Sequence, residues 1–258
     1  MAAPAFREKH GIRTARKIFR QTMEDAPDGE QIDEYLNLVD ETASMPHAHW
    51  REANFFMILA QGAHCFGSLR LPAMYLHTEG IVPYAEFYLA LLAFCRARPD
   101  TLPGEAMARV EQNFIDALGG TEPEPLQIPF FGAGRLYEDQ YFFGQAVLAP
   151  ERFYSAAEIF LRQFGLEPAL AAQLLRYQRE SLLLPGGALE KTREFAYDFP
   201  AYFEAIYDGA PVPLERRAVR LRLTTDCDLT SAVTYYDVVM QTGRYSGNAF
   251  YRTEYLPL

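Results

Sequence analysis

Five residues with metal-binding side chains lie close together in the sequence: His47, His49, His64, Cys65 and His77. Imidazole and thiolate groups are the ligands that zinc prefers. If His49 and His64 share one helix, however, they lie about 22 Å apart along its axis, at roughly 1.5 Å per residue, too far for one ion. His47 and His49 point to different sides of a helix, although an unwound first turn would let them converge. A metal site at His47 and His49 is therefore an alternative to structural roles for these histidines.

The segment Tyr137-Glu-Asp-Gln-Tyr places two carboxylates beside aromatic side chains. A partly buried carboxylate there could act as a general acid or base. Acids adjacent in sequence usually point apart, which is typical of a surface segment, and contact with a substrate is favoured over a catalytic role. We expect Tyr137, Glu138 and Tyr141 to contact substrate, together with Tyr197 and Tyr251 from the C-terminal part. These residues predict a contact surface and leave the catalytic residues unknown.

The cysteines do not form a recognisable reactive or cluster-binding motif. Cys65 and Cys95 fall within apolar helical patterns, where a thiol packs as a small hydrophobe. Cys227 lies between two aspartates, whose charge raises its pKa and opposes formation of the thiolate. The three are spaced too widely for the motif that holds an iron–sulfur cluster. No Gly-x-Ser-x-Gly turn is present to expose a nucleophilic serine.

Composition excludes two classes of partner. The chain has 258 residues, is 49% hydrophobic and carries a formal net charge of −10, which disfavours binding to a nucleic-acid backbone. No apolar stretch reaches the roughly 18 residues of a membrane helix, and residues 1–10 lack the apolar core of a secretion signal. Together with three unpatterned cysteines, this predicts a cytoplasmic protein that has no membrane partner.

The pattern of apolar residues predicts a mainly helical protein. The phenylalanines of these helices are expected to lie mostly in the core; they are Phe55, Phe56, Phe87, Phe114, Phe160 and Phe164. The expected helices run from about Trp50 to Phe66, Leu69 to His77, Pro83 to Cys95, Pro103 to Leu118, Glu151 to Phe164 and Pro168 to Leu184. The prolines of residues 121–131 predict a non-helical linker.

The pattern changes after Gly187. Aromatic residues occupy every second position at Phe195, Tyr197 and Phe199, and apolar and polar residues alternate over 219–224. This period of two predicts two half-buried strands paired as a hairpin. A helix capped by Asp228 and ending at Thr242, then a last strand over 249–255, should follow. The predicted fold class is mainly α with a small C-terminal α+β part, a helical bundle followed by a few antiparallel strands. We divide it into a polar arm (1–45), a helical domain (46–187) with a possible break near 121–131, and a small C-terminal part (188–258).

Several phrases resemble the region that follows the catalytic barrel in cobalamin-binding radical S-adenosylmethionine (SAM) enzymes. The opening Met1-Ala-Ala-Pro-Ala-Phe-Arg-Glu-Lys-His-Gly-Ile resembles the segment directly after that barrel. The other phrases, in chain order, are Glu41-Thr-Ala-Ser-Met, His49-Trp-Arg-Glu-Ala-Asn, Gln61-Gly-Ala-His-Cys-Phe-Gly, Met74-Tyr-Leu, Tyr177-Gln-Arg, Phe195-Ala-Tyr-Asp-Phe-Pro-Ala-Tyr-Phe and Thr242-Gly-Arg-Tyr-Ser-Gly-Asn-Ala-Phe-Tyr.

The resemblance implies a parent enzyme that uses a [4Fe–4S] cluster, S-adenosylmethionine and cobalamin (B12) for methyl transfer or related radical chemistry. In that family a Rossmann-like domain binds cobalamin and the barrel binds the cluster through Cys-x-x-x-Cys-x-x-Cys. The chain contains neither that motif nor an Asp-x-His-x-x-Gly cobalamin loop. The family's cofactor-binding residues therefore have no matching positions here, and the chain alone is expected to bind no cofactor.

Three functions follow from these patterns. The first is the accessory C-terminal region of a cobalamin-dependent radical SAM enzyme: catalytically silent alone, it supports the barrel and shapes the cavity for a small-molecule or peptide substrate. Its partners would be the barrel and the cobalamin domain, in cis or in trans. The second is a freestanding helical protein-interaction subunit with a basic N-terminal arm. The third is a small-molecule or metal-binding domain built around His47, His49 and Glu52.

Overall fold

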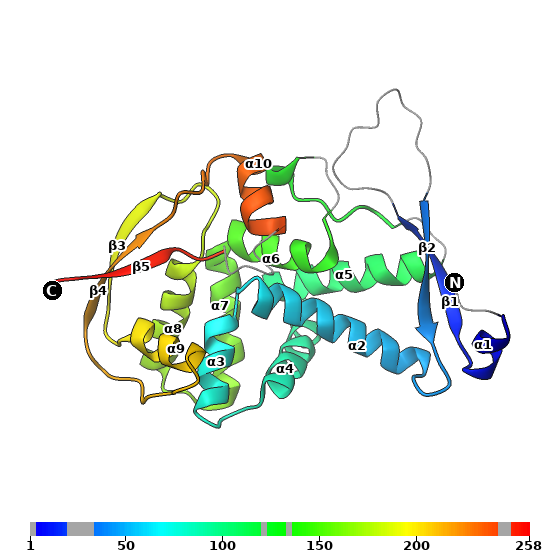
Figure 1. Cartoon of the computed structure of the whole chain (residues 1–258), viewed down its shortest axis with the longest axis horizontal. Coiled ribbons are helices and arrows are strands. Elements are labelled where there is room, and N and C mark those ends of the chain that lie inside the picture. Colours follow the sequence, from blue (N-terminus) through cyan, green and yellow to red (C-terminus); the bar gives the residue numbers. More distant parts are fainter. Residues whose placement is uncertain (1–3, 20–33, 120–122, 133–135, 242–248) are drawn as a thin grey trace.

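The computed structural model describes residues 4–19, 34–119, 123–132, 136–241 and 249–258. Helices make up most of this structure, with a three-stranded antiparallel sheet at one end and a two-stranded hairpin at the other (Figure 1). The predicted fold class, mainly α with a small C-terminal α+β part, is confirmed. The division into 1–45, 46–187 and 188–258 stays a prediction. None of the described helices is long and apolar enough to cross a lipid bilayer.

Apart from α6, which was not predicted, the helices between the two sheets follow the predicted order. They are α2 (His47–Leu59), α3 (Arg70–Thr78), α4 (Tyr84–Ala97), α5 (Leu102–Leu118), α6 (Glu138–Leu148), α7 (Pro150–Leu161) and α8 (Pro168–Ser181). In α4 the side chains of Phe87, Leu91 and Cys95 are buried, as their spacing predicted. The hydroxyl of Thr101 accepts a hydrogen bond from the backbone N–H of Gly104 and begins α5.

One predicted helix has two geometries. The apolar run predicted from Trp50 to Phe66 forms α2 and then continues as a π-helix, Ala60–Cys65. Gly62 in this π-helix approaches α6 so closely that a Cβ atom there would lie 3.0 Å from the ring of Phe142. The wider turn therefore packs directly against a neighbouring helix, and π-helical turns often occur where a fold builds a site.

The helices share a hydrophobic core rich in aromatic rings. Of the phenylalanines expected there, Phe55, Phe87, Phe114 and Phe160 are fully buried, whereas Phe56 and Phe164 pack on the core from its edge. The ring of Phe87 contacts Phe160 edge-on at a centroid distance of 5.2 Å. The aromatic side chains, 14% of the sequence, thus serve mainly to pack the core.

The C-terminal sheet consists of β3 (Glu190–Phe195), β4 (Val219–Thr224) and β5 (Arg252–Leu256), in the order β3-β4-β5. Its inner face carries Phe195, Leu221 and Leu223, all of which are buried. Its outer face carries ion pairs such as Arg220 with Glu194. This alternation is the period of two that predicted the strand over 219–224, and the last strand is also found close to its predicted range.

The strand predicted over Phe195, Tyr197 and Phe199 ends earlier than expected. The alternation of Phe195, Tyr197 and Phe199 ends at Phe195, because Phe199 begins helix α9 (Phe199–Tyr207). Asp198 caps this helix by accepting a hydrogen bond from the Ala201 N–H, and proline is favoured in a first helical turn. The strands around 200–213 pair as predicted, but α9 lies within their connection.

The helix predicted behind Asp228 begins later. Oδ1 of Asp228 accepts hydrogen bonds from Thr230, so it closes a local turn, and Ser231 is the cap of α10 (Ala232–Tyr235). The chain continues as a π-helix, Tyr236–Gln241. The predicted end at Thr242, and residues 242–248 of the last resembling phrase, lie outside the described residues.

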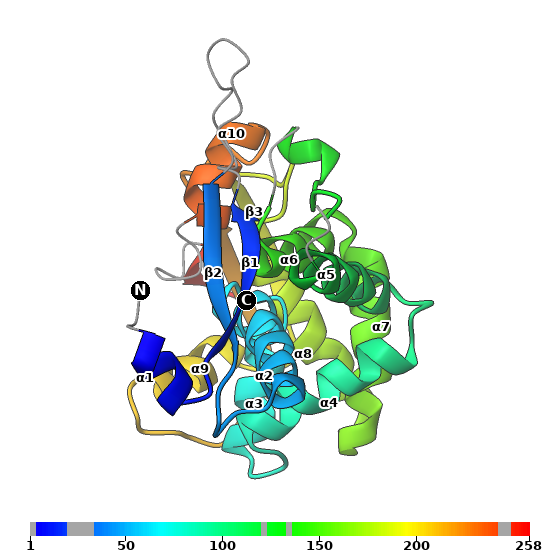
Figure 2. The same cartoon turned by 90° about the vertical axis from the view of Figure 1, so that its right-hand side faces the viewer.

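Several elements were not predicted. The range expected to be a polar arm contains α1 (Pro4–Lys9) and a hairpin of β1 (Arg13–Phe19) with β2 (Glu34–Glu41). The hairpin packs against the helices, β1 on α5 and β2 on α2 (Figure 2). Helix α6 was also missed, and a 3₁₀ turn, Pro129–Phe131, interrupts the segment predicted to be non-helical. Residues 20–33 of the arm and 120–122 near the linker lie outside the described residues.

Candidate functional site

Two hollows bring together residues from distant parts of the sequence. The larger, here called the sheet cavity, has a volume of about 560 Å³ and lies among α3, α8, α9 and residues 250–255. The smaller, here called the helix cavity, has a volume of about 210 Å³ and lies among β2, α2, α5 and the start of α6. The sheet cavity falls in the size range of small-molecule sites.

The C-terminal segment closes one side of the sheet cavity by pairing with the end of α8. The backbone N–H of Leu183 donates to the carbonyl of Ala249 at 2.8 Å, and that of Tyr251 donates to the carbonyl of Ser181 at 2.8 Å. These bonds bring residues about 70 positions apart side by side. The cavity wall they form is strongly aromatic; its rings are those of Tyr177, Phe203, Tyr207, Phe250, Tyr251 and Tyr255.

Arg70, the first residue of α3, lines the same cavity. Its Nε donates to the carbonyl of His64 at 2.7 Å and its Nη2 donates to the carbonyl of Cys65, so the guanidinium is anchored at the end of the π-helix. Its central carbon lies 4.9 Å from the centroid of the Phe250 ring, a cation–π distance.

Gly67 makes this arrangement possible. Its φ of +105° is a conformation that residues with side chains rarely adopt, and a Cβ atom would lie 2.5 Å from the ring of Phe250. Phe250 can therefore reach Arg70 only because residue 67 is glycine.

Three cavity tyrosines, Tyr177, Tyr251 and Tyr255, are held in their neutral form by a raised pKa. Burial raises the pKa of Tyr177, and burial together with the Asp198 carboxylate raises the pKa of Tyr255. Tyr255 donates its hydroxyl proton to Oδ1 of Asp198, and Tyr251 donates to the carbonyl of Ala188 at 2.8 Å. These phenols therefore serve as fixed walls.

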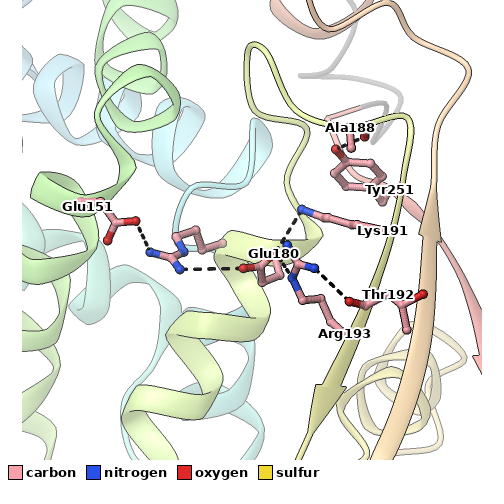
Figure 3. Close-up of polar contacts among 8 residues, drawn as sticks. Glu151, Glu180, Ala188, Lys191, Thr192, Arg193 and Tyr251 are labelled. Atoms are coloured by element: carbon pink, nitrogen blue, oxygen red, sulfur yellow. Dashed lines mark hydrogen bonds and ion pairs between the residues drawn. The ribbon is translucent and has the colours of Figure 1, made fainter.

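A charged cluster on α8 and β3 holds the sheet against the helices (Figure 3). Oε2 of Glu180 lies 3.2 Å from Nζ of Lys191 and 2.9 Å from Nε of Arg193. Nζ of Lys191 also lies 4.3 Å from the centroid of the Tyr251 ring. Burial lowers the pKa of Lys191 despite its pairing with Glu180. Burial raises the pKa of Glu180, but the two cations outweigh it and hold that pKa below its usual range.

The predicted substrate-contact residues do not form one site. Tyr137 and Glu138 line the helix cavity, where the Tyr137 side chain is 44% exposed. Tyr251 lines the sheet cavity, with its hydroxyl bonded to the backbone. Tyr141 is half-buried on α6, and Tyr197 packs 5.7 Å from the Phe199 ring; neither lines either cavity. Sequence reasoning missed Arg70, because the cavity that it lines is formed by four separate segments: α3, α8, α9 and residues 250–255.

The chain has detectable relatives among characterised enzymes. It is 29% identical over 213 residues to the cobalamin-dependent radical SAM methyltransferase TokK of Streptomyces tokunonensis, a match covering 76% of this chain and 31% of TokK. The chain is thus similar to part of this cobalamin-dependent radical SAM methyltransferase. A second relative is the 2-(S-pantetheinyl)-carbapenam-3-carboxylate methyltransferase of Streptantibioticus cattleyicolor, to which the chain is 28% identical over 232 residues (83% of this chain, 33% of that enzyme). No protein-family model matches the chain.

The predicted resemblance to cobalamin-dependent radical SAM enzymes is thus confirmed. The chain spans about a third of the length of these two relatives. The comparison covers most of this chain and leaves about two thirds of each methyltransferase without a counterpart in it.

The described residues do not fit the iron–sulfur cluster of a radical SAM methyltransferase. Cys65, Cys95 and Cys227 belong to three different segments, and burial raises the pKa of Cys95 to about 12, which keeps its thiol protonated. Within the described ranges, no three His, Cys, Asp or Glu side chains are grouped to hold a metal ion. The alternative metal site at His47 and His49 therefore gains no third ligand, and Glu52 is instead paired with Arg96.

Proposed function

We propose that this chain is the accessory part of a cobalamin-dependent radical SAM enzyme, where it supports the catalytic barrel and contributes walls to the substrate cavity. The observation that carries the proposal is the match to two methyltransferases over 76% and 83% of this chain but only about a third of their lengths.

The proposed partners are the barrel and the cobalamin domain, in cis or in trans. The parent enzyme would use a [4Fe–4S] cluster, S-adenosylmethionine and cobalamin, all bound outside this chain. Its reaction would be methyl transfer, because both relatives are named methyltransferases. The substrate would be a small molecule: the Streptantibioticus relative is named for a carbapenam carboxylate that carries a pantetheinyl group.

The helix cavity is the part of this chain best suited to face such a substrate. Tyr137 and Met57 line it and are 44% and 46% exposed, so a partner or substrate can reach them. Glu138 and Asn54 add polar groups to the same hollow. Apolar and polar side chains line this cavity in similar numbers, so its wall offers both packing surface and hydrogen-bonding groups to a small molecule. Tyr141, Tyr197 and Tyr251 would act through packing around the contact surfaces.

The first test is the mass of the protein in its own cells, by immunoblot and mass spectrometry. A species much heavier than 29.3 kDa would place the barrel in the same polypeptide; one at 29.3 kDa would direct the search to a separate subunit with a Cys-x-x-x-Cys-x-x-Cys motif. In either case, the purified 258-residue chain should retain neither iron and sulfide nor cobalamin after anaerobic reconstitution. Stoichiometric cobalamin, or methylation by this chain alone, would overturn the proposal.

A second test addresses the contact surface in the complete enzyme. Tyr137→Phe and Glu138→Gln should raise the KM for substrate or lower kcat, while the absorption of bound cluster and cobalamin stays unchanged. Glu158→Gln is the matched control, because Glu158 is an exposed glutamate on α7 whose described partner is Arg162 one turn away. Unchanged kinetics in both test variants would remove the helix cavity from the substrate path.

A further inference from the structure

We propose that the sheet cavity binds a small organic carboxylate, with its anionic end on Arg70 and its apolar body between the aromatic walls. This site goes beyond the proposed accessory function, because it would bind a ligand through side chains of this chain, Arg70 among them.

The first argument is the charge of Arg70. Its guanidinium is half-buried and, within the described residues, it forms no ion pair; its hydrogen bonds go to two neutral carbonyls. Arg70 is the cation among the residues that line the cavity. Cations next to its tyrosines are paired: Lys191, over the Tyr251 ring, shares Glu180 with Arg193, and Arg217 pairs with Asp198, the acceptor of Tyr255. The positive charge of Arg70 also acts on its surroundings: after burial, it is the second cause of the lowered pKa of His64. A partly desolvated cation without a counter-ion favours an anionic ligand.

The second argument is the geometry of the guanidinium. Nε and Nη2 donate to the carbonyls of two consecutive residues, His64 and Cys65, which occupies the side edge of the fork. The end edge, formed by Nη1 and the second N–H of Nη2, remains for a ligand, and among the described residues Nη1 has no hydrogen-bond partner. Two parallel N–H groups match the two oxygens of a carboxylate. Because the side edge is anchored, little side-chain entropy is lost on binding.

The third argument is the start of α3. The backbone N–H of Leu71 is bonded at 2.8 Å by Oε1 of Gln178, a fully buried side chain, so the first turn of the helix is held at the cavity wall. The positive end of the α3 dipole thus lies beside the Arg70 guanidinium. The dipole of α3 and the charge of Arg70 therefore both favour an anion at the same end of the cavity.

The fourth argument is the shape and lining of the rest of the cavity. Tyr177 is buried at its base, whereas Tyr207 and Tyr255 are 64% and 47% exposed and stand at its mouth. Aromatic walls favour a flat or extended apolar body. Glu204 also lines the cavity and is exposed on α9, and its charge disfavours an anion at that side. The ligand should therefore bind with its carboxylate directed to Arg70.

The test uses two probes of nearly equal shape. Binding of 3-phenylpropionate and of its neutral amide, 3-phenylpropanamide, to the 258-residue chain is measured by isothermal titration and ligand-observed NMR. The carboxylate should bind saturably at one site, and the amide should bind roughly tenfold to a hundredfold more weakly, the range expected for a charge-assisted hydrogen-bonded pair. Arg70→Gln should remove the difference between the two probes.

A cavity-filling variant covers the case in which Arg70→Gln fails to fold. Thr253 lines the cavity from β5, so Thr253→Trp should abolish binding of both probes. Thr192→Trp is the matched control, because Thr192 pairs with Arg222 on the outer face of the same sheet and should leave binding unchanged. The absence of saturable binding, equal affinity for acid and amide, or unchanged binding in Thr253→Trp would each overturn the proposal. None of these outcomes affects the native-mass and cofactor tests of the accessory function.

Discussion

The hydroxyl of Tyr255 donates a 2.5 Å hydrogen bond to Oδ1 of Asp198, which joins β5 to the first turn of α9. Asp198 is only 2% exposed, and it also accepts hydrogen bonds from Arg217 and from the backbone of Ala201. One carboxylate thus holds together a strand, a helix and the mouth of the sheet cavity.

Replacing this carboxylate should reduce stability at neutral pH. Burial raises the pKa of Asp198, but the hydrogen bonds from Tyr255 and Arg217 outweigh it and hold that pKa below its usual range. We expect Asp198→Asn to lower the free energy of unfolding by about 1–3 kcal/mol at pH 7, since charge-assisted hydrogen bonds are lost. Urea unfolding monitored by circular dichroism measures the change.

The effect of Asp198 should depend on pH with a defined sign. Because its pKa is lowered in the folded state, the unfolded chain takes up the proton first as the solution is acidified. The stabilisation is present above the unfolded pKa and is lost as the pH falls towards the folded one, so wild type and Asp198→Asn should converge in acid. Asp226→Asn is the control, because Asp226 is 87% exposed in its pair with Arg252. A constant difference down to the acid limit would contradict this account.

The Glu180 cluster should respond unequally to loss of its members. Glu180→Gln leaves Lys191 and Arg193 without their shared carboxylate, and we expect a loss of about 2–4 kcal/mol, as for breaking partly buried pairs. Lys191→Met should cost less, because Arg193 still pairs with Glu180 and an apolar side chain can pack on the Tyr251 ring. Thermal and urea unfolding compare the two variants. If both variants lost the same free energy of unfolding, the cost would come from losing the Glu180–Lys191 pair itself, and not from leaving buried cations without a carboxylate.

Gly67→Ala should disturb the sheet cavity specifically. The new Cβ would meet the Phe250 ring at 2.5 Å in a backbone with φ of +105°. We expect destabilisation of about 2–4 kcal/mol from backbone strain and overpacking together. Gly186→Ala is the matched control, because Gly186 also has a positive φ (+73°) but open space around its Cβ position. If both variants lost the same stability, the contact with Phe250 would not matter.

His64 should destabilise the protein in weak acid. Burial, together with the charge of Arg70, lowers its pKa to about 4, and its Nδ1 lies 2.7 Å from the Tyr88 hydroxyl. Since the ordinary pKa of histidine is about 6.5, the unfolded chain binds the proton first, and stability should fall between pH 6.5 and 4.

His64→Gln, which keeps a hydrogen-bonding group, should flatten the pH dependence of unfolding over that range. His77→Gln, at an exposed histidine, should leave it unchanged. An imidazole NMR titration of the wild type measures the pKa directly, and a midpoint near 6.5 would refute the assignment.

The parts of the fold that sequence could predict are those with long, uninterrupted periodicity. The Phe87, Leu91 and Cys95 spacing identified α4 because a buried stripe repeated over three turns has few alternatives. The three alternating aromatics from Phe195 were too few to separate a strand from the helix that Asp198 caps. The β1–β2 hairpin was missed because β1, with the sequence Arg-Thr-Ala-Arg-Lys-Ile-Phe, shows no alternation of apolar and polar residues.

The sites depend still more on tertiary contacts. Tyr137 and Glu138 were chosen for their chemistry, and they do line a hollow, because α6 begins at its edge. Tyr251 was chosen for the same reason, but its hydroxyl is bonded within the protein. Arg70 gave no local signal. Its proposed role comes from the packing of Gly67, from a ring 180 positions later and from the lack of a counter-ion among the described residues, which a short window of sequence does not show.

The pairing of residues 249–251 with the end of α8 also fixes when the sheet cavity can form. Arg70 and α3 leave the ribosome long before the strand that closes the cavity, so the nascent chain must hold an open aromatic surface until residues 249–256 have been synthesised. Contacts of such high sequence separation form late and slowly. Chaperone dependence and yield during translation should therefore be more sensitive to changes in β5 than to changes of equal equilibrium cost in α4.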